Sequence, residues 1–305
     1  MMTRHHAIIL TILIIVALGS LAGCALPDAQ FSGEQAYRHV EALMDLGPRP
    51  TGSEANIEAG DYIRRTLEDY GWSVEEQEFP YRGETVRNII AKKGQGPIIL
   101  LGTHYDTRPL ADRDAVDRSQ SVPGANDGGS GTAVLLEIAR VLDSRVTDEA
   151  EIWLAFFDGE DRGGIDGWDW CMGSTLMVND MMARSVPRPE YAVIIDMIGD
   201  KDQQIHYEWS STLWLQEKIW RIADDLGYRR YFVPQYKYEI IDDHTAFLHW
   251  GINAALVIDF DYPFWHTTED TLDKISVDSL QRVGDVMVAL LEQDPFTAGT
   301  ADPSE

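Results

Sequence analysis

The chain has 305 residues, of which 44% are hydrophobic, and its formal net charge is −26. This length and apolar content suffice for one large hydrophobic core. The negative charge argues against nucleic acid as a partner, because phosphate binding needs a basic face. We interpret the charge mainly as a source of solubility, with a weaker role in attracting cationic peptide amino termini.

The first residues have the pattern of an export signal. Residues 7–22 are apolar, and their length suits the core of a signal peptide but is short for a membrane span. The run ends in Leu-Ala-Gly-Cys24, which resembles the lipobox of bacterial lipoproteins. We predict a signal peptide over residues 1–23, then a lipidated Cys24 and a tether over residues 24–33. An uncleaved anchor, or a chance cysteine after a plain signal peptide, is the alternative.

Lipid chains on Cys24 would make a membrane surface a partner of this protein. They would anchor it in the bacterial cell envelope while the folded domain stays in water. Cys171 is the only other cysteine, so no internal disulfide framework is available if Cys24 is lipidated. Neither cysteine is a good candidate for a zinc cluster. We expect the protein to be a monomer.

Residues 34–293 are expected to form one α/β domain, because no internal repeat and no second boundary is visible. Residues 294–305 are expected to be a frayed tail. Outside the segments considered next, the predicted elements are helices over residues 34–46 and 53–70, strands over 72–79 and 86–91, and helices over 129–142, 213–226 and 277–291.

Four short apolar runs, rich in β-branched residues, predict buried parallel strands. They cover residues 97–103, 152–157, 191–195 and 254–258, and lead respectively into His104, into Glu160 and Asp161, into Asp196, and into Asp259 with His266 beyond it. Ligands bind at the carboxyl ends of such strands. Carboxylates and imidazoles are common ligands of divalent metals such as zinc. The pattern therefore predicts a metalloenzyme with a mixed, mostly parallel central sheet flanked by helices.

A glycine-rich loop over residues 122–131 leads into a predicted helix and contains Asp127. A phosphate cradle is one interpretation, but the loop lacks the lysine of a P-loop and the GxGxxG order. We favour a metal ligand that a tight loop holds in place. An ordinary turn aspartate is the alternative.

Glu160 and Asp161 are adjacent at the end of the very apolar run 152–157. Neighbouring residues on an extended chain point in opposite directions. One carboxylate can therefore bind a metal while the other faces the substrate as a general base. Confinement near a metal also separates their pKa values, which suits acid/base chemistry. A solvated acidic turn is the alternative.

Two histidine motifs lie near the last apolar run. Residues 242–244 (Asp-Asp-His) precede a helical pattern, so Asp243 is equally well interpreted as the N-cap of a helix. His266 follows Trp265 in a loop beyond the strand. A lone histidine is usually structural, but its place beyond a strand end favours a metal ligand.

Six motifs in the same order resemble those of the M28 zinc-peptidase superfamily over essentially all of the mature region. They are LGPRPTGS (46–53), GTHYD (102–106), PGANDGGSG (123–131), FFDGED (156–161), DDH (242–244) and WHT (265–267). A narrower likeness to the glutaminyl-peptide cyclotransferases, especially bacterial ones, is carried by HYDTRP (104–109), WCMGS (170–174), IDDH (241–244) and WHT. The resemblance implies an α/β fold of the zinc-aminopeptidase, or phosphorylase/hydrolase-like, type.

For a cyclotransferase, the resemblance implies that N-terminal glutamine of a peptide or protein is converted to pyroglutamate with release of ammonia. Asp127, Asp161 and His266 match the ligands of a single zinc. Glu160 matches the catalytic acid/base. One departure is Asp161, where many relatives have a glutamate of longer reach.

The same resemblance implies roles for further residues around the substrate. Asp196 and Asp242 match a pair of acids that share a hydrogen bond beside the catalytic acid/base. Trp265 matches the aromatic wall of the substrate pocket. Trp168 and Trp170 are the two candidates for the rest of that wall, and the sequence does not choose between them.

A zinc aminopeptidase of the same superfamily is the main alternative. Asp127 would then bridge two zinc ions, with His104 and Asp196 holding the second, and Glu160 would serve the hydrolysis of the first peptide bond. Typical aminopeptidases resemble Tyr-His and Ser-Asp-His where this chain has the WHT and DDH motifs, which favours the cyclotransferase. A non-catalytic surface lipoprotein is a third possibility, but it predicts a broken ligand set, and the set here is complete.

Overall fold

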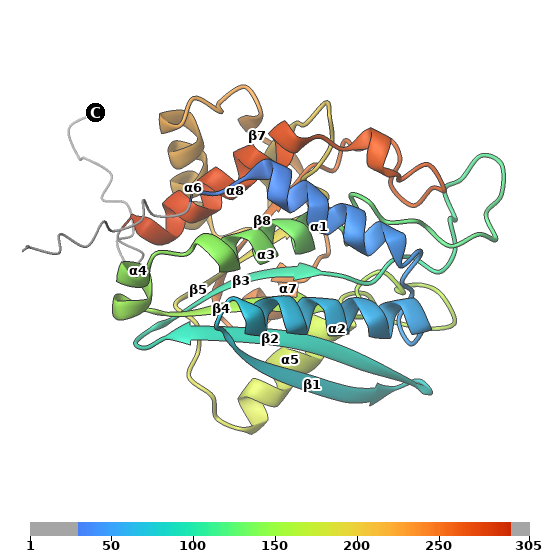
Figure 1. Ribbon diagram of the computed structural model, residues 1–305, viewed down its shortest axis with the longest axis horizontal. Helices are drawn as coiled ribbons and strands as arrows, with labels where there is room; N and C mark the ends of the chain where they lie inside the picture. Colours follow the sequence, from blue (N-terminus) through green and yellow to red (C-terminus); the bar gives the residue numbers. More distant parts are fainter. Residues whose placement is uncertain (1–29, 294–305) are drawn as a thin grey trace, which may run out of the picture.

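A six-stranded mixed sheet runs through the centre of the molecule, in the strand order β1-β2-β4-β3-β5-β8 (Figure 1). Its strands are β1 (Ser73–Tyr81), β2 (Glu84–Gly94), β3 (Ile98–His104), β4 (Glu151–Phe157), β5 (Tyr191–Asp196) and β8 (Asn253–Ile258). β4, β3, β5 and β8 are mutually parallel, whereas β2 pairs antiparallel with both β1 and β4. The parallel strands bring four carboxyl ends to one edge of the sheet.

The computed structural model describes residues 30–293. The predicted signal peptide, Cys24 and the tail over residues 294–305 lie outside this range, so they stay predictions. Within residues 30–293, no helix combines the length and the apolar character needed to cross a membrane. The first helix, α1 (Gly33–Asp45), begins after Ser32, whose side chain accepts a hydrogen bond from the amide of Gln35.

The central strands are buried along their whole length because helices cover both faces of the sheet. Every residue of β3 and β5 is buried, as expected for parallel strands packed on two sides. β1, at the edge, has only one buried residue. The prediction of an α/β domain with a mixed central sheet flanked by helices is confirmed.

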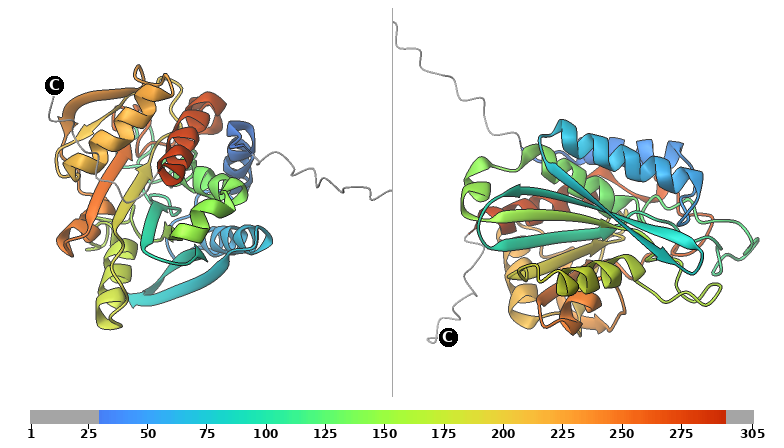
Figure 2. Two further views of the ribbon diagram at one scale, coloured as in Figure 1. Left: turned by 90° about the vertical axis from the view of Figure 1, so that its left-hand side faces the viewer. Right: turned by 90° about the horizontal axis from the view of Figure 1, so that it is seen from below.

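Helices pack on the sheet from two sides, as Figure 2 shows. One core cluster joins one face of the sheet to α1, α2 (Glu54–Asp69), α3 (Ser130–Val141), α6 (Leu213–Asp225) and α8 (Val277–Glu292). The other cluster joins the opposite face to α5 (Met172–Ala183) and α7 (His244–His249). The remaining helical segments are α4 (Ser144–Glu149) and the 3₁₀ turn Leu272–Lys274.

The hairpin of β1 and β2 is longer than the sequence pattern predicts. Arg82 and Gly83 form its two-residue turn, with φ values of 48° and 91°. Two left-handed residues in succession match the twist of the flanking strands. Pairing therefore continues up to Tyr81 and Glu84.

A small separate sheet was not predicted. It consists of β6 (Ile205–Glu208) and β7 (Phe232–Tyr238), which are parallel with an irregular register. β7 leads into the segment 239–242, which lines the cavity described below. The segment that follows the small sheet thus forms one side of the candidate site.

Candidate metal centre and active site

Five predicted ligands from separate segments meet at the carboxyl ends of the parallel strands. Among residues 30–293 they form two trios, each made of buried residues with ligand atoms within 4.8 Å of one another. The trios share Asp127, which precedes α3: one is Asp127, Asp161 and His266, and the other is His104, Asp127 and Asp196.

The first trio has carboxylate oxygens that could bind a cation. His266 Nε2 lies 2.9 Å from Asp161 Oδ1 and 3.9 Å from Asp127 Oδ2. The Oδ2 atoms of both aspartates are buried and have no hydrogen-bond partner in the described part of the chain. Burial, together with the charge of Asp161, raises the pKa of Asp127 well above its usual value. Two crowded carboxylates and an imidazole fit a divalent metal, which would offset this repulsion.

The second trio is held together by its histidine. His104 Nε2 lies 3.0 Å from Asp196 Oδ1 and 3.2 Å from Asp127 Oδ1. Burial alone would lower the pKa of His104, but Asp196, Asp106 and Asp127 raise it well above the usual value. The arrangement suits either a charged imidazole that bridges two carboxylates or a second metal ion.

Backbone amides position the ligand loops through two buried aspartates. Asp106 accepts hydrogen bonds from the amides of Glu160 and Asp161, over 3.2 and 3.1 Å. Asp270 accepts a bond from the amide of Asp127 over 3.1 Å and another from the preceding amide. Neither role was predicted, although Asp106 lies within the GTHYD motif and Asp270 lies three residues after the WHT motif.

His266 is fixed from both sides of its ring. Its backbone has a φ of 59°, a left-handed conformation that is strained for a residue with a side chain. Asp112 Oδ1 lies 3.3 Å from its Nδ1 atom, which orients the ring and presents Nε2 to the other ligands. The Trp170 ring lies parallel to the imidazole within 7°, with centroids 6.1 Å apart.

Glu160 faces a cavity of about 330 Å³ beside the first trio. Its carboxylate accepts a hydrogen bond from the thiol of Cys171 over 3.3 Å. Burial raises the pKa of Glu160 well above its usual value, although the charge of His104 opposes the shift. Glu160 therefore lies on the substrate side, next to a ligand in sequence but outside both trios.

Asp196 and Asp242 line the same cavity. Burial, then the charge of Asp196, raises the pKa of Asp242 to about 7. A proton shared between these two acids stays a prediction. Asp243 occupies the N-cap position of α7 but makes no side-chain cap; it accepts a hydrogen bond from Ser174 over 2.5 Å instead.

The sequence left undecided whether Trp168 or Trp170 lines the substrate pocket, and the structure distinguishes them. Trp170 and Trp265 both line the cavity, together with Phe260. Trp168 is buried in a small cluster with Val86 and Met172, because it follows a tight turn that points it toward the β1–β2 hairpin. It does not line the cavity.

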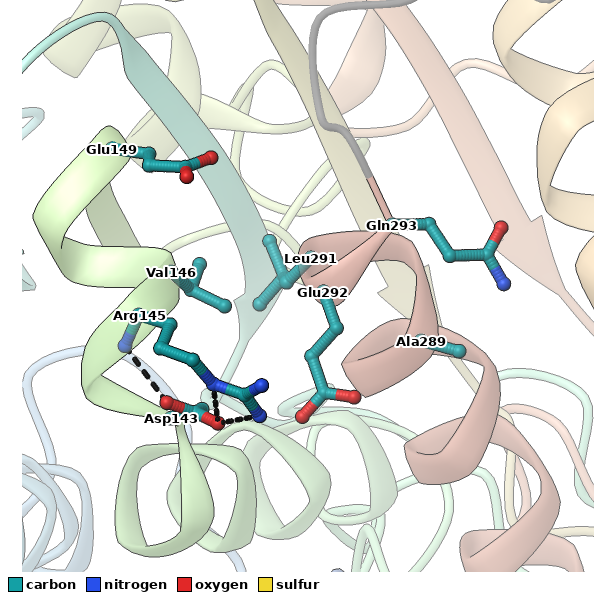
Figure 3. A pocket seen from close by; sticks show the side chains of 8 residues that line it. All are labelled: Asp143, Arg145, Val146, Glu149, Ala289, Leu291, Glu292 and Gln293. Carbon is teal, nitrogen blue, oxygen red and sulfur yellow. Dashed lines mark hydrogen bonds and ion pairs between the residues drawn. The ribbon is translucent and has the colours of Figure 1, made fainter.

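Two other features can be set aside. Asp259, at the end of β8, accepts hydrogen bonds from nearby backbone amides and belongs to neither trio. A larger cavity of about 470 Å³ lies between α4 and the end of α8 (Figure 3). Its Arg145 donates to Asp143 over 2.7 Å. This cavity adjoins the amino end of β4, opposite the metal-type residues, so we assign the chemistry to the smaller cavity.

Comparison with known proteins finds similarity over most of this chain. The family model described as Peptidase family M28 matches residues 88–291. A glutaminyl cyclase from Porphyromonas gingivalis superposes with a TM-score of 0.81 at 32% identity, over 86% of this chain and 98% of that one. A leucine aminopeptidase precursor from Bacteroides thetaiotaomicron superposes with a TM-score of 0.81 at 29% identity, over 88% and 99%.

A curated relative is longer than this chain. Aminopeptidase YwaD from Bacillus subtilis (strain 168) is 29% identical over 293 residues, which cover 86% of this chain. The alignment spans only 57% of YwaD. The similar proteins thus include both a cyclase and aminopeptidases, and the choice between these activities depends on the cavity.

Proposed function

Because the chain belongs to peptidase family M28, we propose that it is a zinc-dependent glutaminyl-peptide cyclotransferase. It would convert the N-terminal glutamine of a peptide or protein to pyroglutamate and release ammonia. Similarity to a solved glutaminyl cyclase supports this activity. The chain covers little more than half of YwaD, so that protein is a weaker guide.

The observation that carries the proposal is the acid pair in the cavity. Asp242 lines the cavity near Asp196 and has a pKa of about 7 because of burial and the charge of Asp196. A carboxylic acid that keeps its proton near neutral pH can donate a hydrogen bond to an oxygen that gains negative charge. Cyclisation develops such an oxygen at the γ-amide of the substrate.

The metal would be held by Asp127, Asp161 and His266. A zinc ion bound there would supply Lewis-acid polarisation of the γ-amide carbonyl. The three ligands offer two carboxylates and one imidazole, a set that suits zinc. We propose one zinc per chain, with the His104 imidazole bridging Asp127 and Asp196 in place of a second ion.

Glu160 would move the protons. In the ionised form, which the positive charge of a bound metal would favour, it takes a proton from the substrate α-amine, whose nitrogen attacks the γ-carbonyl carbon and closes a five-membered lactam. The bond from that carbon to the amide nitrogen then breaks, and Glu160 returns the proton so that ammonia leaves. The buried position of Glu160 beside the cavity allows both transfers without bulk water.

The aromatic side chains on the cavity walls would hold the substrate in the conformation that cyclisation requires. Attack within one molecule is fast only when the glutamine side chain is folded back on its own amine. Trp170 and Trp265 lie on the walls of the cavity beside His266. They can hold the folded side chain and exclude the water that would favour hydrolysis over cyclisation.

A zinc aminopeptidase is the second candidate function. The second trio of His104, Asp127 and Asp196 favours it, because these three residues could hold another metal ion. Glu160 would then serve as the general base of hydrolysis. Similarity to a leucine aminopeptidase precursor supports this alternative.

One experiment separates the two functions. The domain is incubated with Gln-terminated and Leu-terminated peptide reporters, and bound zinc is counted by elemental analysis. Ammonia release from the Gln reporter with one zinc per chain is the expected result. Leucine release with two zinc ions would reject the cyclotransferase.

We also propose that the protein is exported and anchored through lipid on Cys24. The support is the sequence Leu-Ala-Gly-Cys24 after an apolar run. Metabolic labelling with an alkyne fatty acid should mark the wild-type protein but not Cys24→Ser. Equal labelling of both proteins would reject the anchor.

A further inference from the structure

A row of aromatic side chains leads out of the cavity and onto the small sheet. We name it the aromatic track; it consists of Trp265, Phe260, Tyr238, Tyr236 and Trp209. Trp265 and Phe260 line the cavity, and their ring centroids lie 4.8 Å apart. Phe260 in turn contacts Tyr238 of β7, with centroids 5.1 Å apart. The first three rings therefore form a continuous contact from the cavity wall to β7.

The outer end of the aromatic track is exposed. Trp209 and Tyr236 stack with centroids 4.1 Å apart and ring planes within 19°. The two side chains are nevertheless 60% and 38% exposed. Neighbouring exposed aromatic side chains of this size are uncommon on a monomer surface and are typical of binding sites.

Hydrogen bonds connect the exposed stack to the rim of the cavity. The amide of Trp209 donates to the carbonyl of Tyr238 over 2.9 Å. The neighbouring Glu208 accepts a hydrogen bond from the amide of Ile240 over 3.2 Å, and Ile240 lines the cavity. The pairing of β7 with β6 is irregular between Tyr236 and Tyr238, so the link between the stack and Tyr238 is the backbone hydrogen bond of Trp209. These two hydrogen bonds connect the segment that carries Trp209 to the chain segment that lines the cavity.

We infer that the aromatic track binds the side chains of the residues that follow the N-terminal glutamine, and so selects peptides with aromatic or large apolar residues there. This inference rests on the proposed function, because the N-terminal residue must occupy the cavity. A peptide that leaves the cavity in an extended conformation advances about 3.3 Å per residue and presents alternate side chains to the track. Aromatic pairs form favourable offset stacks beyond simple area burial.

Charge on the same rim adds to this selectivity. Glu239 is exposed and lines the cavity. Lys237 is already paired with Asp261 over 2.6 Å, so it offers little attraction to an acidic peptide. With a net charge of −26 on the chain, acidic residues after the glutamine should be disfavoured. Neutral aromatic peptides are the expected substrates.

The test compares three amide substrates: glutamine amide, Gln-Ala-Ala-Ala amide and Gln-Phe-Phe-Ala amide. For the wild-type protein, kcat/KM for the aromatic peptide should exceed that for the alanine peptide about fivefold or more, mainly through KM. Trp209→Ala should remove this advantage and leave glutamine amide turnover unchanged. Trp209→Phe should restore part of it. Leu226→Ala is the matched control, because Leu226 is 43% exposed and lies at the end of α6, by a different cavity.

The outcomes distinguish the two proposals. Failure to cyclise glutamine amide would reject the proposed function. Turnover of glutamine amide with equal kcat/KM for both peptides would overturn the aromatic track alone. If Trp209→Ala shifts the sedimentation coefficient from that of a dimer to that of a monomer, the track is a self-association surface and the inference is wrong. Should Trp209→Ala fail to fold, Tyr236→Ala removes the same stack and should abolish the same advantage.

Discussion

The thiol of Cys171 donates a hydrogen bond to Glu160 Oε1 over 3.3 Å, from the N-terminal end of α5. Cys171 has a φ of 55°, in the left-handed region that few residues with a side chain adopt. Burial, then the charge of Glu160, raises the pKa of the thiol well above its usual value, so it stays a donor. A strained backbone thus aims a neutral thiol at the proposed proton shuttle.

Cys171→Ala should lower kcat about threefold to tenfold and leave KM unchanged, because a single hydrogen bond of about 1 kcal/mol is lost. Cys171→Ser should retain most of the wild-type kcat, since a hydroxyl also donates. Steady-state kinetics with a Gln reporter checks both, and the melting temperature controls for packing. Full kcat in Cys171→Ala would show that Glu160 is positioned by other contacts.

Glu160→Gln should bind zinc like the wild-type protein but lose at least about a hundredfold in kcat, as removal of a general base does. Glutamine keeps the size of the side chain and cannot accept the α-amine proton. Elemental analysis and initial rates on the same preparation measure the two properties. A variant that keeps both its zinc and its rate would remove Glu160 from the mechanism.

The number of zinc ions per chain depends on whether one trio or both trios bind the metal. We expect one zinc in the wild-type protein and in His104→Gln, but none in His266→Gln after dialysis. Chelation should also lower the melting temperature of the wild-type protein, because a ligand present at a hundredfold excess over its Kd stabilises by about 2.7 kcal/mol. Two zinc ions in the wild-type protein and one in His104→Gln would instead support the aminopeptidase.

The sequence predicted the central strands well for a physical reason. A parallel strand buried on both faces is apolar along most of its length, and β3 and β5 are apolar up to the polar residues at their carboxyl ends. α5 escaped prediction because its apolar residues are not confined to its buried face: Met181 is buried, but the equally apolar Met182 next to it is 52% exposed. β7 escaped because four of its residues are exposed and polar or proline residues interrupt it.

The candidate ligands could be singled out because each lies at the end of a predicted strand, in the loop beyond it, or within the glycine-rich loop, and the family resemblance grouped them into sets. Their supporting residues could not, since support depends on which loops fold over one another. Asp112 reaches His266 only because the loop after β3 lies against the loop after β8. Likewise the sequence could not choose between Trp168 and Trp170, two residues apart, because turn geometry sends one into a core cluster and the other to the cavity.

The free energy of unfolding should fall at acidic pH because Glu208, near the cavity rim, becomes protonated. Burial alone would raise the pKa of Glu208. Hydrogen bonds from His244 and the Ser210 amide outweigh this effect and lower the pKa from 4.5 to about 2. A carboxylate with a lowered pKa in the folded state stabilises the protein above pH 4.5, and this contribution is lost as the pH falls from 4.5 to 2.

Glu208→Gln should therefore flatten the pH dependence of the free energy of unfolding below pH 4.5. Urea titrations at several pH values between 6 and 3 measure the difference from wild type. Glu217→Gln, at an exposed position on α6, is the control and should follow the wild-type curve. Parallel curves for wild type and Glu208→Gln would contradict the shift.

Arg49 joins the segments that lead to the ligand loops, and it is completely buried. Its guanidinium donates to the carbonyls of Tyr105 and Gly124 over 3.2 and 2.8 Å, and to three further carbonyls. Burial lowers its pKa to about 10, so it stays charged at neutral pH. Gly124 lies three residues before Asp127, so Arg49 ties the Asp127 loop to the end of β3.

Arg49→Met should lower the free energy of unfolding by about 3 kcal/mol or more, because it leaves several buried carbonyls without a donor. Arg49→Lys should recover only part of this lost free energy. A single ammonium group cannot reach all the carbonyls that the forked guanidinium of Arg49 contacts on its two sides. Urea unfolding measures both variants. Arg64→Met, which removes a surface ion pair with Glu68, should cost less than about 1 kcal/mol. If Arg49→Met were as mild as that control, water must satisfy the carbonyls, and zinc affinity should then also match the wild-type value.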